Sequence, residues 1–372
     1  MKSKHIYKSI ACGVLLALTA TSCDLDYNPV DSYSDVTEGV DKTDEKPIFN
    51  SVQDVETSMV TLHKKFRDQQ EHWYVDKLLI GDAHSDNAYA GTTGAEVVPY
   101  ETNSIEGSNS VLKRDWDRFL GDIAEANRII VGCEQLKALS DSERDKYQSQ
   151  AKIFRAMVMF DMVRLWGNFP VITTVGGDIT EDNVEEMYPT YFPPQNTAEE
   201  AYAQIEKDLT EAVENPNTPT NDASDKSILT KSVARAMLAK VYAEKPLRDY
   251  AKVIKYADEL AADGFDLVED FSDLWAYDTE KKDCRVRNTK EAILEAHFPP
   301  GSGNWCTWMF GRNLSNWDES FTWAKWITPS RDLIRLYEEQ GDTKRYNESV
   351  VWYECGWSNY YPADHYAFMY KC

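Results

Sequence analysis

Apolar side chains recur at intervals of three and four residues over much of this chain, and this helical period restricts the fold more than any other feature. Residues 111–131 carry one long apolar stripe, made of Leu112, Trp116, Phe119, Leu120, Ile123 and Ile130. Residues 147–166 carry a second stripe, made of Ala151, Phe154, Val158, Met162 and Leu165. Gly167 and Pro170 follow it and favour a helix end. The pattern predicts amphipathic helices that bury one face against each other.

Shorter helices are predicted in pairs. Thr197 and Glu200 have the spacing of a capping box, in which each side chain bonds to a free N–H group of the first turn. Residues 230–243 and 249–263 form two further apolar-periodic segments that resemble one tetratricopeptide-type hairpin. No strict repeat period is visible. We therefore expect a mostly α fold, an irregular tetratricopeptide-like helical-repeat scaffold with long loop insertions.

Two later segments complete this prediction. Ser330 has the position of an N-cap for a helix over residues 330–339, and Gly341 lies just beyond its end. Residues 291–298 alternate weakly, which favours a short strand or an extended segment. Sheet content should therefore be minor.

The first residues have the features of an export signal. Lys2, Lys4 and Lys8 precede an apolar run over residues 10–20, which is too short to span a bilayer. Cys23 follows Thr21 and Ser22, so this end resembles a bacterial lipobox, although a plain signal peptide with a stray cysteine remains an alternative. We expect a signal peptide at 1–22 and a lipidated Cys23.

The remaining chain divides by composition. Residues 23–50 are rich in Asp, Ser, Thr and Pro and should form an extended tether after Cys23. Residues 51–264 contain the predicted helical scaffold, and residues 265–372 form a loop-rich region. Five cysteines lie downstream without zinc spacing: Cys133, Cys284, Cys306, Cys355 and Cys372. Export would permit a disulfide between one pair of them, and the spacing does not identify which.

The charge excludes one class of partner. Lys and Arg number 40 against 63 Asp and Glu, a formal net charge of −23. Nucleic-acid binding depends on Lys and Arg that replace counterions, so we expect no nucleic-acid partner. Anionic lipid would also be repelled, and membrane attachment would come from acyl chains on Cys23.

The chain shows no catalytic motif. Its histidines lack zinc-protease spacing, and neither a GxSxG elbow nor a GxxxxGK[ST] phosphate loop is present. Carboxylate pairs occur everywhere among 63 acids and so carry no weight for a glycosidase. We predict a protein that is not an enzyme and that has no cofactor and no dedicated metal site.

A binding site is better supported, by an aromatic segment over residues 301–326. Its Trp and Phe residues are interleaved with Gly, Asn and Arg, which favours loops rather than a helix or strand. Sugar rings stack on such aromatics while amides bond to their hydroxyls. The candidate ligand-binding residues here are Asn304, Trp305, Trp308, Asn313 and Trp317. Trp323 and Trp326 have even odds of being structural.

Several segments together resemble the SusD/RagB family of surface glycan-binding lipoproteins. The most telling is AKIFRAMVMFDMVRLWGNFP over residues 151–170, which is similar to the family's Arg-Ala helix and Trp-Gly-x-x-Pro turn. Similar segments in the family's order are Trp116 with residues 126–130, and residues 197–209, 231–242, 265–275, 290–298, 329–334 and 341–346. The resemblance covers nearly the whole chain from Cys23. Family chains usually continue beyond the equivalent of Tyr370, so the resemblance implies that the region ending at Cys372 is incomplete.

The resemblance implies a function and a second wall for the site. It implies an outer-membrane, surface-exposed lipoprotein that captures oligosaccharide and delivers it to a SusC-like TonB-dependent transporter as a hinged lid. It also places the insertion over residues 81–109 at the same end of the scaffold as the aromatic segment. Candidate residues in this insertion are Asp82, Asp86, Asn87, Tyr89 and Tyr100.

Alternatives to this hypothesis remain. The same lid role with a peptide or another nutrient is one, and a surface-anchored glycoside hydrolase is a second. A third is an adaptor that binds only proteins, which would leave the aromatic segment unexplained. Asp82 and Asp86 are solvated loop carboxylates or, alternatively, ligands of a divalent cation.

Overall fold

The computed structural model describes residues 47–90, 96–177, 179, 181, 183–274, 277–278, 280–281, 283–300, 327–353 and 366–369. All of these except Pro47 belong to one compact unit, Ile48–Cys372. The predicted signal peptide at 1–22, Cys23 and the aromatic segment over 301–326 lie outside the described residues.

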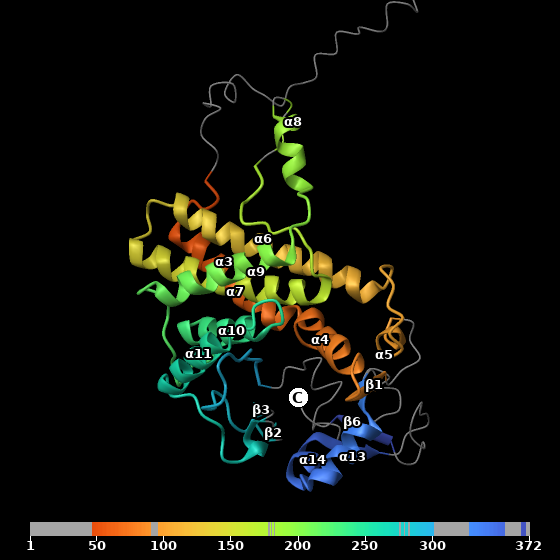
Figure 1. Cartoon of the computed structure of the whole chain (residues 1–372). Helices are drawn as coiled ribbons and strands as arrows, with labels where there is room; N and C mark the ends of the chain where they lie inside the picture. Colours follow the sequence, from red (N-terminus) through yellow and green to blue (C-terminus); the bar gives the residue numbers. More distant parts are fainter. Residues whose placement is uncertain are drawn as a thin grey trace, which may run out of the picture. The chain divides into compact units, whose positions relative to one another are not determined.

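Two long helices form the centre of the scaffold (Figure 1). They are α6 (Ser110–Gln135) and α7 (Asp141–Trp166). Asn109 caps α6, and Ser140 with Glu143 forms a capping box for α7. Gly167 ends α7 at a φ of +71°, a conformation that favours glycine. Both predicted long helices are therefore confirmed, with α7 starting earlier than its apolar stripe because the cap precedes the stripe.

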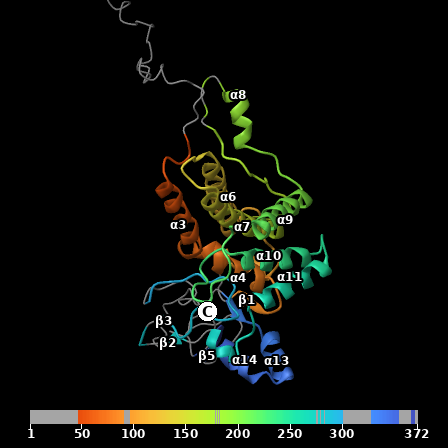
Figure 2. The ribbon, with the colours of Figure 1, turned by 90° about the vertical axis from the view of Figure 1, so that its left-hand side faces the viewer.

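The remaining helices of the scaffold pack in sequence order on α6 and α7. They are α3 (Val52–Asp68), α9 (Ala198–Glu214), α10 (Lys231–Ala243) and α11 (Tyr250–Ala262). α3 contacts α6, α9 contacts α7 and α10, and α10 pairs with α11, as Figure 2 also shows. The capping box of Thr197 and Glu200 and the predicted hairpin of α10 and α11 are both present. The fold is thus mostly α, as predicted.

A single large apolar core joins these helices. Its fully buried members include Phe119 and Ile123 from α6, Phe154 from α7, and Leu209 from α9. Leu238 of α10 belongs to the same core. The apolar stripes read from the sequence are therefore the faces that meet in the interior.

The insertion between α3 and α6 is helical but irregular. It contains the π-helical turns η1 (Glu71–Val75) and η2 (Leu79–Ala83), joined by α4 (Asp76–Leu78), and later α5 (Val98–Glu101). Single π turns inside helices are frequent at functional sites. Leu79, Val97 and Tyr100 form a second, smaller core with Val111 at the start of α6.

Sheet is minor among the described residues, as predicted. Three antiparallel two-stranded pairs are present: β1 (Ala88–Ala90) with β4 (Ile327–Pro329), β2 (Tyr277–Asp278) with β3 (Asp283–Cys284), and β5 (Val350–Tyr353) with β6 (Tyr366–Met369). Residues 291–298 contain a turn, a bend and irregular backbone, and they form no strand. The short helical elements are α8 (Val184–Met187), η3 (Tyr188–Tyr191), η4 (Phe271–Leu274), α13 (Arg331–Gln340) and α14 (Thr343–Ser349).

Candidate functional site

The β1–β4 pair joins the early insertion to the end of the aromatic segment. Tyr89 lies opposite Thr328 and Ala90 lies opposite Ile327 in the antiparallel register. Ile327 is 1% exposed and packs into the small core with residues of the insertion. The residue that immediately follows the aromatic segment is therefore held beside β1.

Ser330 strengthens this junction from the start of α13. Its backbone N–H donates to the Asn87 carbonyl oxygen at 2.9 Å, and its hydroxyl donates to the Asp86 carbonyl oxygen at 2.5 Å. The same hydroxyl oxygen accepts from the Leu333 N–H at 3.0 Å, which caps α13 as predicted. A hydroxyl can donate once and accept as well, so one side chain both starts the helix and fastens it to the insertion.

Asp86, Asn87 and Tyr89, which we call the early wall, differ in their roles. Asp86 and Asn87 are exposed. In the part of the chain that is described, no hydrogen bond reaches the Asp86 carboxylate or the side-chain amide of Asn87. Tyr89 is half-buried, and its hydroxyl oxygen accepts from the Arg331 N–H at 3.2 Å. Asp86 and Asn87 thus present polar groups to solvent, whereas Tyr89 connects β1 to α13.

Tyr100, also in this insertion, differs from the prediction. Tyr100 is fully buried, and its hydroxyl donates to Asn109 Oδ1 at 3.3 Å. The prediction that Tyr100 lines a pocket is wrong, because its ring fills the small core.

Burial raises the pKa of the Asp82 carboxyl. Among the residues that the structure describes, no group of three or more His, Cys, Asp or Glu side chains could hold a metal ion.

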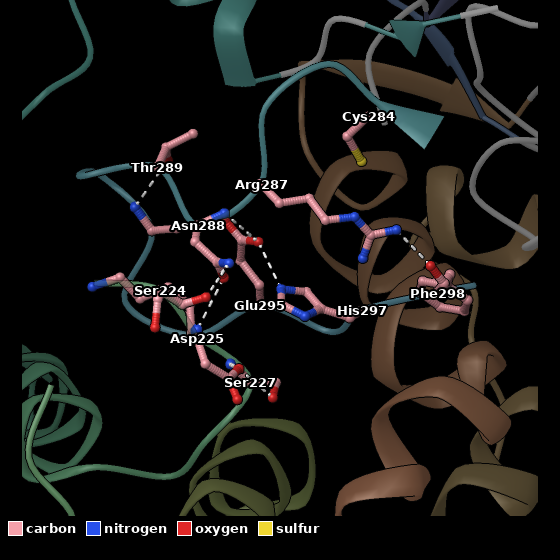
Figure 3. A network of polar contacts seen from close by, with 12 residues as sticks. Ser224, Asp225, Ser227, Cys284, Arg287, Asn288, Thr289, Glu295, His297 and Phe298 are labelled. Carbon is pink, nitrogen blue, oxygen red and sulfur yellow. Dashed lines mark hydrogen bonds and ion pairs between the residues drawn. The ribbon is translucent and has the colours of Figure 1, made fainter. Parts of the chain in front are cut away.

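A polar network holds the chain that leads into the aromatic segment (Figure 3). Asn288 is its centre, at a left-handed φ of +55°. Its side-chain amide donates to the Ser224 carbonyl oxygen at 2.7 Å, and its Oδ1 accepts from the Lys226 N–H at 2.9 Å. The Asn288 N–H donates to Glu295 Oε2 at 3.0 Å, and the Glu295 N–H donates to the Lys226 carbonyl oxygen at 2.9 Å. These bonds fasten residues 288–295 to the segment before α10.

The network continues to the last described residues before the aromatic segment. Glu295 Oε2 also lies 3.0 Å from His297 Nε2. Arg287 pairs with Asp283 at 2.5 Å and donates from Nη2 to the Phe298 carbonyl oxygen at 2.6 Å. Arg287 therefore holds Phe298, and β1 holds Ile327, so described contacts fix the chain on each side of residues 301–326.

The sequence missed this second anchor. Arg287 and Asn288 lie outside the segments that resemble the family, and Glu295 lies in one of them without a predicted role. Asn is one of the residue types that adopt a left-handed backbone more readily, which is the one signal at Asn288. Of the predicted ligand-binding residues, the structure brings Asp86, Asn87 and Tyr89 to the β4 junction. Asn304, Trp305, Trp308, Asn313 and Trp317 lie outside the described residues.

A separate surface hollow of about 400 Å³ lies between the start of α7 and the end of α9. Lys152 crosses it to Glu211 at 2.8 Å, and Asp145 accepts from Asn217 at 2.8 Å. No aromatic side chain lines it, so it offers no stacking surface. These residues are ordinary helix-surface charges, and nothing in the sequence marks them.

Two arginines of α7 pair with acids. Arg155 bonds to Asp208 inside the scaffold, and Arg164 lies 3.1 Å from Glu244. Cys133 and Cys284 are both free thiols, buried and exposed respectively. No helix in the described part of the chain combines the length and the apolar character needed to cross a bilayer.

The described helices and short strand pairs form a helical-repeat scaffold with loop insertions. Residues 31–243, more than half of the chain, match the SusD-like family described as "Starch-binding associating with outer membrane". The chain belongs to the SusD-like family.

Relatives and solved structures agree with this family. A SusD-like protein of Bacteroides ovatus is 25% identical over 318 residues, which cover 82% of this chain and 51% of that protein. The chain thus spans about half the length of this curated relative. A SusD superfamily protein of Bacteroides vulgatus has a similar fold, with a TM-score of 0.65, 16% identity, and coverage of 87% of this chain and 68% of that one.

A further solved structure with this fold is the surface glycan-binding protein A of Bacteroides thetaiotaomicron in complex with laminarihexaose. Its TM-score is 0.63 at 16% identity, and the match covers 80% of this chain and 63% of that one. At this identity the likeness concerns the fold.

Proposed function

We propose that this chain is a non-catalytic, surface-exposed lipoprotein that captures an oligosaccharide and delivers it to a SusC-like TonB-dependent transporter. The glycan site would lie between the aromatic segment and the early wall of Asp86, Asn87 and Tyr89. Trp305, Trp308 and Trp317 would supply stacking faces. Family membership supports the general role, and a relative of the same fold was solved with laminarihexaose.

The observation that carries this proposal is the β1–β4 register. It places Ile327 opposite Ala90, so the chain that leaves the aromatic segment runs along β1 to Ser330, which lies beside Asp86 and Asn87. The Arg287 network attaches the other end at Phe298. A binding loop attached at both ends loses less conformational entropy when it closes on a ligand than a free one.

The chemistry of these residue types fits a sugar. Indole rings offer flat apolar faces for the C–H side of a pyranose, and carboxylate and amide groups accept or donate hydrogen bonds to hydroxyls. Binding pockets typically combine such apolar walls with a few polar groups that set orientation. Asp86 and Asn87 would provide these polar groups.

The binding experiment is a titration of mature protein, residues 24–372, with laminarihexaose and a panel of other soluble glycans, followed by Trp fluorescence. Trp305→Ala, Trp317→Ala and Asn87→Ala should each weaken a saturable signal, while circular dichroism stays helical. Lys113→Ala, an exposed change on α6, is the control and should bind like the parent. A helical protein with no glycan response would contradict glycan capture and favour a peptide ligand.

The attachment and delivery steps need their own test. Cys23→Ser should release the protein from membranes, because acylation would be its only anchor. The SusC-like transporter should co-purify with the parent protein from detergent-solubilised membranes. Recovery of the lipoprotein alone under gentle conditions would count against the lid role. Release of reducing ends that a single carboxylate substitution abolishes would instead show a glycoside hydrolase.

A further inference from the structure

The excursion between α7 and α9 carries an apolar surface that the rest of the fold does not cover. Its described residues are 175–177, 179, 181 and 183–192, which we call the arm. In Figures 1 and 2 the helix α8 stands off α6 and α9, with α8 and η3 packed on each other. The arm therefore projects from the helical scaffold.

A hydrogen bond joins the two sides of the arm. The Tyr191 hydroxyl donates to the Gly177 carbonyl oxygen at 2.6 Å. A Cβ added at Gly176 would lie 3.2 Å from Tyr191 Cζ, and one added at Gly177 would lie 2.9 Å from Met187 Cε. Glycine therefore permits the close approach of the two sides.

The outer face of the arm is apolar and aromatic. Its exposed members are Val175, Ile179, Val184, Tyr188, Tyr191 and Phe192. They make up half of the strongly exposed large hydrophobic residues in the described part of the chain. Phe192 is 67% exposed, and its ring lies 4.9 Å from that of Tyr188. Exposed apolar residues gathered in one segment favour an interaction site, and Tyr and Phe are enriched at protein–protein interfaces.

The charge around this patch has one sign. No Lys, Arg or His occurs from residue 165 to residue 206. Glu181, Glu185 and Glu186 of the arm are exposed. A partner would therefore need an apolar surface bordered by basic side chains, because complementary charge steers association and like charge opposes it.

We propose that the arm is the surface on which a protein partner docks, through an apolar groove bordered by Lys and Arg. This proposal takes from the proposed function only the identity of the partner to test, the SusC-like transporter. A second copy of this chain does not fit, because its arm would carry the same negative charge. An anionic lipid surface does not fit for the same reason.

The test uses the full chain, expressed with its leader in a host that carries a tagged SusC-like transporter. Tyr188→Ser with Phe192→Ser removes the two most exposed aromatic rings of the patch. The matched control is Tyr250→Ser with Leu267→Ser, residues of equal exposure outside the arm. A third variant, Glu185→Lys with Glu186→Lys, reverses the charge next to the rings. The readouts are recovery with the transporter from detergent extracts and glycan binding by Trp fluorescence.

The arm variants should lower recovery with the transporter about tenfold or more, the size of a lost interface hot spot, while glycan binding is kept. The control pair should be recovered like the parent. Equal recovery of parent and arm variants would overturn the arm proposal alone. No recovery of the parent itself would overturn the delivery role, and the arm proposal with it. Loss of sedimentation with anionic vesicles only in the arm variants would overturn the protein partner in favour of a lipid surface.

Discussion

The Arg155 guanidinium and the Asp208 carboxylate form two hydrogen bonds, of 2.8 and 2.7 Å, inside the contact between α7 and α9. Both side chains are almost fully buried, and Arg155 Nη1 also donates to Asn127 Oδ1 of α6 at 2.7 Å. Three neighbouring helices are therefore joined at one buried ion pair. Such a pair is costly to break from one side, because the remaining buried charge then lacks a counter-ion.

Arg155→Met should destabilise the protein by about 3–5 kcal/mol, because it leaves the Asp208 carboxylate buried and unpaired. The double change Arg155→Met with Asp208→Leu should recover much of this loss, since no charge then remains. Urea unfolding followed by circular dichroism measures both. Lys113→Met, which removes a surface pair with Asp117, should cost less than about 1 kcal/mol. Equal losses for the single and double variants would contradict the argument.

A buried carboxyl pair should make stability depend on pH. Burial, and then the negative charge of Asp76, raise the pKa of Asp115 to about 9, while Arg114 opposes the shift. An unfolded chain would release this proton near pH 4, so the native state holds an extra proton between about pH 4 and 9. The free energy of unfolding should therefore fall as pH rises through that window, by at most about 1.4 kcal/mol per pH unit.

Asp115→Asn tests this dependence, because the amide cannot ionise and can still donate to Asp76. Urea unfolding at pH 5, 7 and 8.5 should show a flatter pH dependence than in the parent. Asp117→Asn on the exposed face of the same helix is the matched control and should keep the parent slope. An unchanged slope in Asp115→Asn would mean that another group releases the proton.

Gly132 and Gly121 on α6 should respond oppositely to alanine. A Cβ at Gly132 would lie 2.4 Å from two ring carbons of Phe49, which is itself buried. Gly132→Ala should therefore destabilise by about 1–3 kcal/mol through overpacking. Nothing lies within 4 Å of a Cβ at Gly121, so Gly121→Ala should stabilise by about 0.5–1 kcal/mol through helix propensity. Thermal unfolding of both variants decides the signs.

Ser330→Ala should lower both stability and glycan affinity. The change removes the cap of α13 and the bond to the Asp86 carbonyl oxygen, at a cost of about 1–2 kcal/mol. Ser140→Ala removes the cap of α7, far from the early wall in sequence, and should cost stability without changing affinity. Urea unfolding and fluorescence titration of both variants separate the two effects. Equal affinities would show that the β1–β4 junction does not position the site.

Several features of the fold follow from local sequence alone. The apolar period of residues 111–131 and 147–166 predicts α6 and α7, and Thr197 with Glu200 predicts the start of α9. The sequence also predicts Ser330 as a helix cap, because capping bonds join residues only a few positions apart. Short-range hydrogen bonds and the helical period depend only on residues close together in the chain, so the sequence determines them directly.

The tertiary structure alone decided how these elements form a site. Asp86 and Ser330 lie 244 positions apart, and their bond depends on how the chain closes over the scaffold. No local pattern marks the left-handed Asn288 network or distinguishes the buried Tyr100 from the half-buried Tyr89. Burial and long-range pairing are properties of the packed chain, because they depend on which distant surfaces meet. The sequence therefore determined the helices and the chemistry of the candidate residues, and packing decided which of them face solvent beside the start of α13.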